Sequence, residues 1–118
     1  MLTGVEISVI LKLSNKRKDG NNMTLEQKAT QTLFEAGVPC NLFGFKYLRA
    51  AIVLCCADTE KLNALTKVLY PEISKMYKLG DWRRVERCMR SALMKSNHKN
   101  KANGVFLSEV VWKINEEL

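Results

Sequence analysis

Hydrophobic and polar positions divide the chain into a short strand-like segment followed by a longer helical part. From Val5 to Leu13, apolar residues alternate with mostly polar ones, and this period of two is typical of a half-buried strand. The polar stretch Ser14 to Asn22, which contains Gly20, indicates a turn or linker. Helical periodicity begins at Thr24. The pattern predicts residues 1–23 as a strand-like segment with its linker, and residues 24–118 as one domain.

The domain is predicted to begin with two helices. Thr24 and Gln27 have the spacing of a capping box, and Gly37 with Pro39 ends the helix that they begin. The second helix, about Gly44 to Ala57, is apolar nearly all round. Such a helix is expected at the centre of a fold, with its neighbours packed around it.

Four further helices are predicted, at about 59–69, 71–78, 82–95 and 105–117. The first of them carries Leu62, Leu65 and Val68 as its apolar stripe. Pro71 suits the first turn of the next. The expected fold class is therefore mainly α, a helical bundle of about six helices with an N-terminal β-strand.

The helices at 71–78 and 82–95 are joined by a tight turn that contains Gly80, which is the pattern of a helix-turn-helix. Successive residues of a helix are rotated by about 100°. On the longer helix, one side then collects Trp82, Val85, Cys88, Met89, Ala92 and Leu93. The opposite side carries Arg83, Arg87, Arg90 and Met94, flanked by Arg84 and Ser91, with Glu86 at the other edge. We expect the helix to pack by its apolar side and to present its arginines outward.

This outward side has the chemistry of major-groove reading. The planar fork of arginine matches the O6 and N7 atoms of guanine, and glutamate can accept a hydrogen bond from cytosine N4. The predicted base-reading residues are Arg83, Arg84, Glu86, Arg87 and Arg90. The predicted phosphate-contacting residues are Lys67, Tyr70, Lys75, Lys78 and Lys95. Tyr70 fits a core position equally well.

The distribution of charge supports a polyanionic partner. The chain has a net charge of +7, and residues 59–101 alone carry that whole excess. A localised basic region is typical of nucleic-acid binding. Double-stranded DNA is the partner we expect. Two alternatives stay open at this stage: a solvated basic surface, and a protein-interaction module whose arginine face binds an acidic protein partner. RNA is a weaker alternative, because no stacking aromatics lie among the basic residues.

Other classes of function find little support in the sequence. The four cysteines include the adjacent Cys55 and Cys56 and form no CxxC motif, and the single histidine, His98, lies in a polar stretch. We therefore expect reduced cysteines, no metal, no cofactor and no enzyme activity. No apolar run approaches the roughly 18 residues of a membrane span, and the pattern of the first residues does not predict a secretion leader. A cytoplasmic location is expected.

Three strings in the chain resemble a known family. They are EAGVPCNLFGFKYLRAAI (35–52), TKVLYPEISKMY (66–77) and RVERCMRSAL (84–93). They are similar to the C-terminal DNA-binding effector domain of stage 0 sporulation protein A, the sporulation initiation response regulator. The likeness covers about residues 24–118, and the 23 residues before Thr24 are too few for that regulator's receiver domain.

The resemblance implies an all-helical domain with a helix-turn-helix that binds short promoter boxes and regulates transcription in sporulation. The base-reading residues of the family match Glu86, Arg87 and Arg90, and Arg84 matches a further arginine of the recognition helix.

The strand-like segment Val5 to Leu13 has no partner strand elsewhere in the sequence. An isolated strand leaves its backbone hydrogen bonds unmade and its edge open. We expect this segment to pair with the same segment of a second copy, which would make a homodimer. The alternative is that it packs on its own domain.

Overall fold

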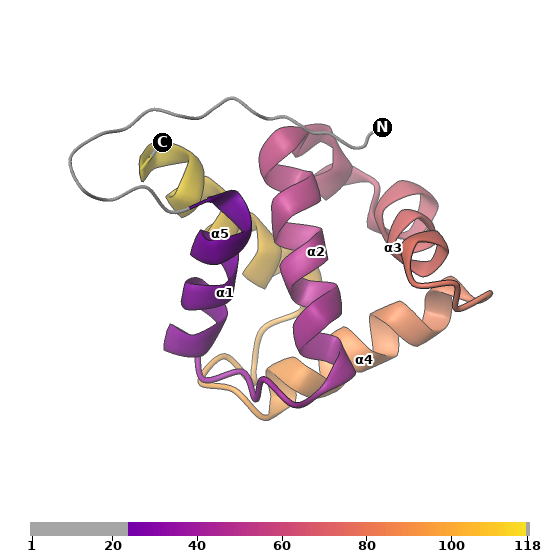
Figure 1. Ribbon diagram of the computed structural model, residues 1–118, viewed down its shortest axis with the longest axis horizontal. Helices are drawn as coiled ribbons and strands as arrows, with labels where there is room; N and C mark the ends of the chain where they lie inside the picture. Colours follow the sequence, from indigo (N-terminus) through magenta and orange to yellow (C-terminus); the bar gives the residue numbers. More distant parts are fainter. Residues whose placement is uncertain (1–23, 118) are drawn as a thin grey trace.

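The computed structural model describes residues 24–117, which contain five α-helices (Figure 1). They are α1 (Leu25–Glu35), α2 (Phe43–Ala57), α3 (Tyr70–Met76), α4 (Trp82–Met94) and α5 (Asn103–Glu117). A 3-10 helix, η2 (Thr59–Asn63), and a π-helix, η3 (Leu65–Leu69), connect α2 to α3. The mainly helical fold class is confirmed. The predicted strand at Val5 to Leu13 lies outside the described residues.

Local hydrogen bonds explain where α1 begins and ends. The Thr24 hydroxyl accepts a hydrogen bond from the Gln27 amide at 3.1 Å, and the Gln27 side chain accepts one from the Thr24 amide at 2.9 Å. At the other end Gly37 has a φ of 82°, and the Val38 amide donates to the Leu33 carbonyl. This is the capping box and glycine-terminated helix that the sequence predicts.

Helix α2 lies at the centre of the fold, as its apolar sequence predicts (Figure 1). Helices α1, α4 and α5 pack around it, and eight of its residues are buried. Its closest neighbour is α4. A Cβ atom on Gly44 would lie 2.2 Å from the Cys88 carbonyl oxygen and 2.7 Å from the Ala92 Cβ. Only a glycine at this position allows the two helices to approach so closely.

The expected count of six helices is corrected to five in the described part of the chain. The helix expected at about 59–69 is divided into η2 and η3. Asp58 accepts a hydrogen bond from the Glu60 amide and begins a tight 3-10 turn, and Ala64, at φ −143°, interrupts the helical backbone. Val68, expected to face the core, is 41% exposed. The apolar residues of this stretch do have helical spacing, but they are not buried together as one stripe.

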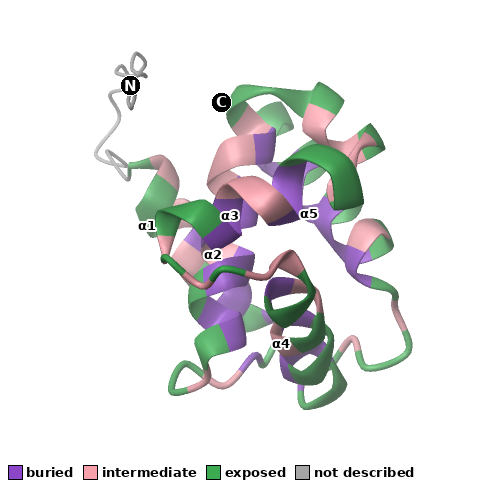
Figure 2. Ribbon diagram, turned by 90° about the vertical axis from the view of Figure 1, so that its right-hand side faces the viewer, coloured by how far each residue is buried: buried purple, intermediate pink, exposed green. Residues whose placement is uncertain are grey.

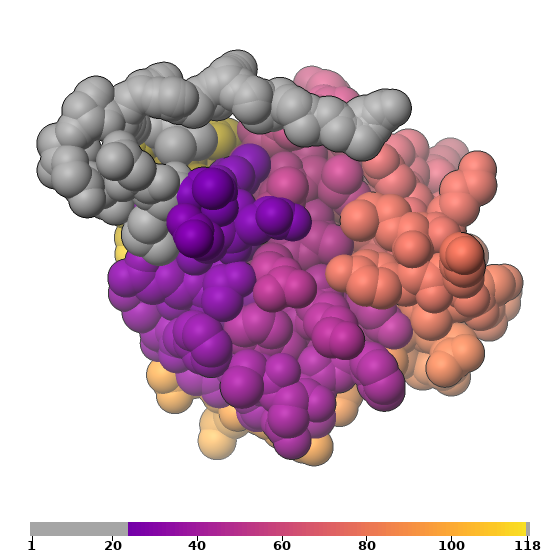
Figure 3. Space-filling model, in the orientation of Figure 1, coloured from indigo at the N-terminus to yellow at the C-terminus, as the bar shows by residue number. Residues whose placement is uncertain are grey.

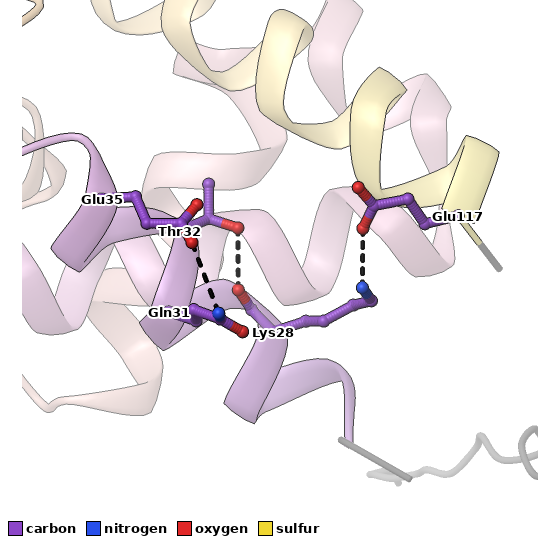
Figure 4. Close-up of polar contacts among 5 residues, drawn as sticks. All are labelled: Lys28, Gln31, Thr32, Glu35 and Glu117. Carbon is purple, nitrogen blue, oxygen red and sulfur yellow. Dashed lines mark hydrogen bonds and ion pairs between the residues drawn. The ribbon is translucent and has the colours of Figure 1, made fainter. Parts of the chain in front are cut away.

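Helix α5 packs against α2 and α4. The Lys28 ammonium donates to the Glu117 carboxylate at 2.6 Å and so connects α1 to the C-terminal end of α5 (Figure 4). The space-filling view shows α1 and α2 side by side on one face, with the α3 region next to them (Figure 3). No helix among residues 24–117 is both long and apolar enough to cross a membrane.

Candidate nucleic-acid interface

Helices α3 and α4 form the helix-turn-helix, and backbone hydrogen bonds fix the turn between them. The Leu79 amide donates to the Ser74 carbonyl at 2.9 Å and the Lys78 amide to the Lys75 carbonyl at 3.2 Å, which together make a Schellman motif. Lys78 has a φ of 56° and Gly80 a φ of 79°. The Asp81 carboxylate then accepts from the Arg83 amide at 3.0 Å and caps α4.

The buried side of α4 is the one that the helical spacing predicts. Val85, Met89 and Leu93 are at most 1% exposed and belong to the core that α4 shares with α2. The other side of α4 carries exposed residues along its length (Figure 2). The outward position of the arginine face therefore follows from the packing of the opposite face.

A groove of about 470 Å³ lies between α4 and η3. Four of the five predicted base-reading residues, Arg83, Glu86, Arg87 and Arg90, line it together with Leu65, Thr66, Tyr70 and Trp82. The fifth, Arg84, is exposed but does not line the groove. Burial raises the pKa of Tyr47 on α2, and the positive charge of Arg84 partly opposes that rise. On α4, Arg84 is thus exposed outside the groove that the other four residues line.

The first turn of α4 holds an aromatic stack. The Trp82 ring stacks on the Tyr70 ring with centroids 6.1 Å apart and planes 11° from parallel. The Arg83 guanidinium carbon lies 5.4 Å from the centroid of the Trp82 ring, and its Nη1 atom lies 3.7 Å from the Asp81 carboxylate. The side chain of Arg83 nevertheless remains 69% exposed, so a ligand can reach it.

The next turn holds an ion pair. The Arg90 Nη1 atom lies 3.1 Å from the Glu86 Oε2 atom, one helical turn away. Arg87, between them in sequence, makes no ion pair with any residue of the described range. The two arginines thus differ, because Arg90 is oriented by a carboxylate and Arg87 is not.

The lysines predicted to contact phosphates surround the helix-turn-helix and are exposed. Lys67 lies on η3, Lys75 on α3, Lys78 in the turn and Lys95 at the C-terminal end of α4. None of these four lysines pairs with a carboxylate of residues 24–117. Their ammonium groups are therefore available to an external anion.

Tyr70 is placed differently from an exposed phosphate contact. Its side chain is only 4% exposed, and its hydroxyl accepts a hydrogen bond from Asn103 Nδ2 at 3.3 Å. Burial raises the pKa of Tyr70, and the hydrogen bond from Asn103 partly opposes that rise. A phosphate contact by Tyr70 stays a prediction, and its burial, the aromatic stack and the bond to Asn103 favour the core position that the sequence left open.

Asn103, at the start of α5, is a residue of the site that no sequence pattern indicated. Its Nδ2 atom also donates to the Glu86 carbonyl on α4 at 3.2 Å, so one buried amide bridges α3, α4 and α5. Both partners are more than fifteen residues away in the chain, and no local pattern reports such contacts. Asn103 therefore holds two of the residues that line the groove, Tyr70 and Glu86, in fixed positions.

The described cysteines and histidine form no metal site. All four thiols are free, and no three His, Cys, Asp or Glu side chains between residues 24 and 117 gather in a way that could hold a metal ion.

The model of the family described as sporulation initiation factor Spo0A C terminal matches residues 29–115. The match begins within α1 and reaches into the last turn of α5, so it includes the helix-turn-helix and its groove.

Proposed function

Since the chain belongs to the family of sporulation initiation factor Spo0A C-terminal domains, we propose that it binds double-stranded DNA sequence-specifically and regulates transcription. This family consists of DNA-binding effector domains of sporulation control and is not a family of enzymes. The observation that carries the proposal is the exposed arginine face of α4, set on a helix whose opposite face is buried.

The arrangement suits the major groove of DNA. That groove is wide enough for one α-helix, and a recognition helix places the side chains of its N-terminal part against the base edges. Arg87 and Arg90 are the proposed readers of guanine. Glu86 orients Arg90 through their ion pair, or accepts from a cytosine. Arg83 is a proposed reader at the start of the helix, and Arg84 is a further proposed base contact that lies outside the groove of the other four.

Phosphate contacts supply the sequence-independent part of the affinity. We assign them to Lys67, Lys75, Lys78 and Lys95, which lie on or beside the helix-turn-helix and are free of carboxylate partners in the described residues. Such contacts fix the register of a protein on the duplex and make its binding depend on salt.

Selection of bound duplexes from a random pool, at a stated salt concentration, tests the proposal. The expected result is enrichment of one short motif that contains guanines, bound at least 10³-fold more tightly than random duplex. A pool that yields no motif, with equal affinity for every duplex, would contradict sequence-specific binding. Failure to bind any duplex, together with salt-dependent binding to an acidic protein, would favour the protein-interaction alternative.

We also propose that the full chain forms a homodimer through Val5 to Leu13. The support is the alternating pattern of this segment, whose five apolar residues are unfavourable to leave in water. Val9→Asp, at the centre of the segment, is expected to give a monomer when the protein is weighed in solution. A dimer that survives the substitution, or a wild-type monomer, would contradict pairing.

A further inference from the structure

We propose that Trp82 is a specificity-determining positioning residue, which holds the Arg83 guanidinium in place for contact with a base edge. The inference rests on the proposed DNA-binding function. It concerns a residue that lines the groove but whose side chain is not among the usual partners of base edges, so we assign Trp82 a role through its neighbour Arg83.

One ring of the aromatic stack belongs to the hydrophobic core. Tyr70 is buried, and its hydroxyl is held by Asn103, which also donates to the backbone of α4 at Glu86. These bonds restrain the phenol ring with respect to both α3 and α4. Tyr70 therefore offers a fixed surface at the floor of the groove.

Trp82 lies on that surface. It occupies the first position of α4, is half-buried, and its ring is within 11° of parallel to the Tyr70 ring. Aromatic pairs of this kind are stabilised beyond the apolar area that they bury. With its backbone in the helix and its ring stacked, the indole has little freedom left.

The restrained indole ring in turn limits the movement of the Arg83 side chain. An exposed arginine ordinarily samples many rotamers, and ordering such a side chain on binding costs affinity. Here the guanidinium lies 5.4 Å from the indole centroid and 3.7 Å from the Asp81 carboxylate before any ligand binds. The cation–π contact and the carboxylate preorganise a side chain that remains largely exposed to a ligand. Loss of this preorganisation is expected to lower affinity about three- to tenfold.

A double-mutant cycle tests the coupling. Trp82→Leu, Arg83→Ala and the double variant are compared with wild type on the duplex that wild type selects and on random duplex, well below their melting temperatures. Each single change is expected to weaken binding to the selected duplex about three- to tenfold, and random duplex less. The double variant is expected to bind no more weakly than Arg83→Ala alone, because Trp82 acts only through Arg83.

Two matched variants separate positioning from stability. Trp82→Phe keeps a ring under the guanidinium and is expected to bind within about twofold of wild type. Trp112→Leu makes the same substitution at a tryptophan of α5 that is 70% exposed and outside the groove, and it should leave binding unchanged. In the free protein, the side-chain protons of Arg83 should show a ring-current NMR shift that Trp82→Leu removes and Trp82→Phe retains.

Independent losses, which multiply in the double variant, would overturn the inference. So would an equal loss on selected and random duplexes, or an Arg83 NMR shift that does not depend on the indole. These outcomes all presuppose a wild-type protein that selects a duplex. A wild type that selects none fails the proposed function itself, and the two failures are therefore distinguishable.

Discussion

The four arginines of α4 lie in four different surroundings. Arg83 lies over Trp82, Arg87 makes no ion pair within the described range, Arg90 pairs with Glu86, and Arg84 is outside the groove. A helical wheel groups these residues by angle and can separate Arg84 from the rest. It does not reveal the aromatic stack, because the lower ring of that stack belongs to α3. The sequence thus predicted which arginines are outward, and the structure adds that neighbouring side chains orient Arg83 and Arg90 but that Arg87 has no ion-pair partner in the described range.

Replacing Lys78 by glycine is predicted to change the stability of the protein and its affinity for DNA in opposite directions. A non-glycine residue at a φ of 56° is strained by about 1–2 kcal/mol, and glycine relieves this strain at a smaller entropic cost. Lys78→Gly is therefore expected to leave stability unchanged or raise it by about 1 kcal/mol. It should weaken binding to the selected and the random duplex alike. It should also reduce by about 1 the slope of log affinity against log salt concentration.

Lys75→Gly is the matched control for Lys78→Gly. It removes the same charge from the neighbouring α3, where glycine costs about 1 kcal/mol of stability. Thermal unfolding and binding at two salt concentrations measure both variants. Equal destabilisation by the two substitutions would show that the turn does not have the left-handed geometry described above.

The cysteines make a prediction about reactivity and pH. Burial raises the pKa of the Cys55 thiol from 9.0 to about 11 and that of Cys56 to about 12, whereas Cys40 is exposed. The thiolate is the reactive form, so alkylation at pH 8 followed by mass spectrometry should modify Cys40 well before Cys55 and Cys56. Modification of all three at one rate would contradict the packing around α2.

The same pKa shifts set a direction for stability. The folded state keeps these two thiols protonated to a higher pH than the unfolded chain does. Their contribution to stability is therefore fully present below pH 9 and is lost as the pH rises through about 11 to 12.

At the scale of elements, the contact between α2 and α4 determines where the recognition helix lies. Gly44→Ala would place a Cβ atom 2.2 Å from a backbone carbonyl of α4, so the helices would have to separate. Overpacking of this kind typically costs about 1–3 kcal/mol. Denaturant unfolding should show a loss of at least that size.

Gly104→Ala is the control for Gly44→Ala. Its Cβ would lie 3.1 Å from the flexible end of Leu65, and α5 would gain helix propensity, so stability should change by less than about 1 kcal/mol. If Gly44→Ala is as well tolerated as Gly104→Ala, the close approach of α2 and α4 is wrong.

Elements were predictable where their signals are local. The capping box at Thr24, the stop at Gly37 and the buried side of α4 depend on residues a few positions apart, and each is confirmed. The prediction for 59–69 was wrong because the apolar spacing of this stretch suits an α-helix, whereas Asp58 and the non-helical backbone of Ala64 divide it into a 3-10 and a π segment. Only packing against the rest of the fold decides between those conformations.

On the scale of the whole molecule, basic charge is concentrated at the helix-turn-helix. The net charge of residues 59–101 equals that of the entire chain, and the structure places the arginines on one groove with the exposed lysines on the elements around it. The sequence could predict this concentration because α3, the turn and α4 are contiguous. It could not predict that Tyr70 and Asn103 meet behind the groove, since the two residues are 33 positions apart.

Arg49 provides a control for the whole-molecule charge. It lies on α2, beside Phe34 and Thr30 of α1, and does not line the groove of α4. Replacing it by alanine removes one positive charge, as does the same change at Arg87. Any effect of net charge alone is therefore shared by the two variants, and a difference between them reports the position of the arginine.

The most direct test of sequence-specific reading by α4 compares Arg87→Ala with Arg49→Ala on the selected duplex and on random duplex at one salt concentration. Arg87→Ala is expected to weaken binding to the selected duplex by about 1–3 kcal/mol and binding to random duplex by clearly less. Arg49→Ala is expected to change the free energy of binding to either duplex by less than about 0.5 kcal/mol. Equal losses from the two variants, or an equal loss on both duplexes for Arg87→Ala, would contradict the reading of bases by this helix.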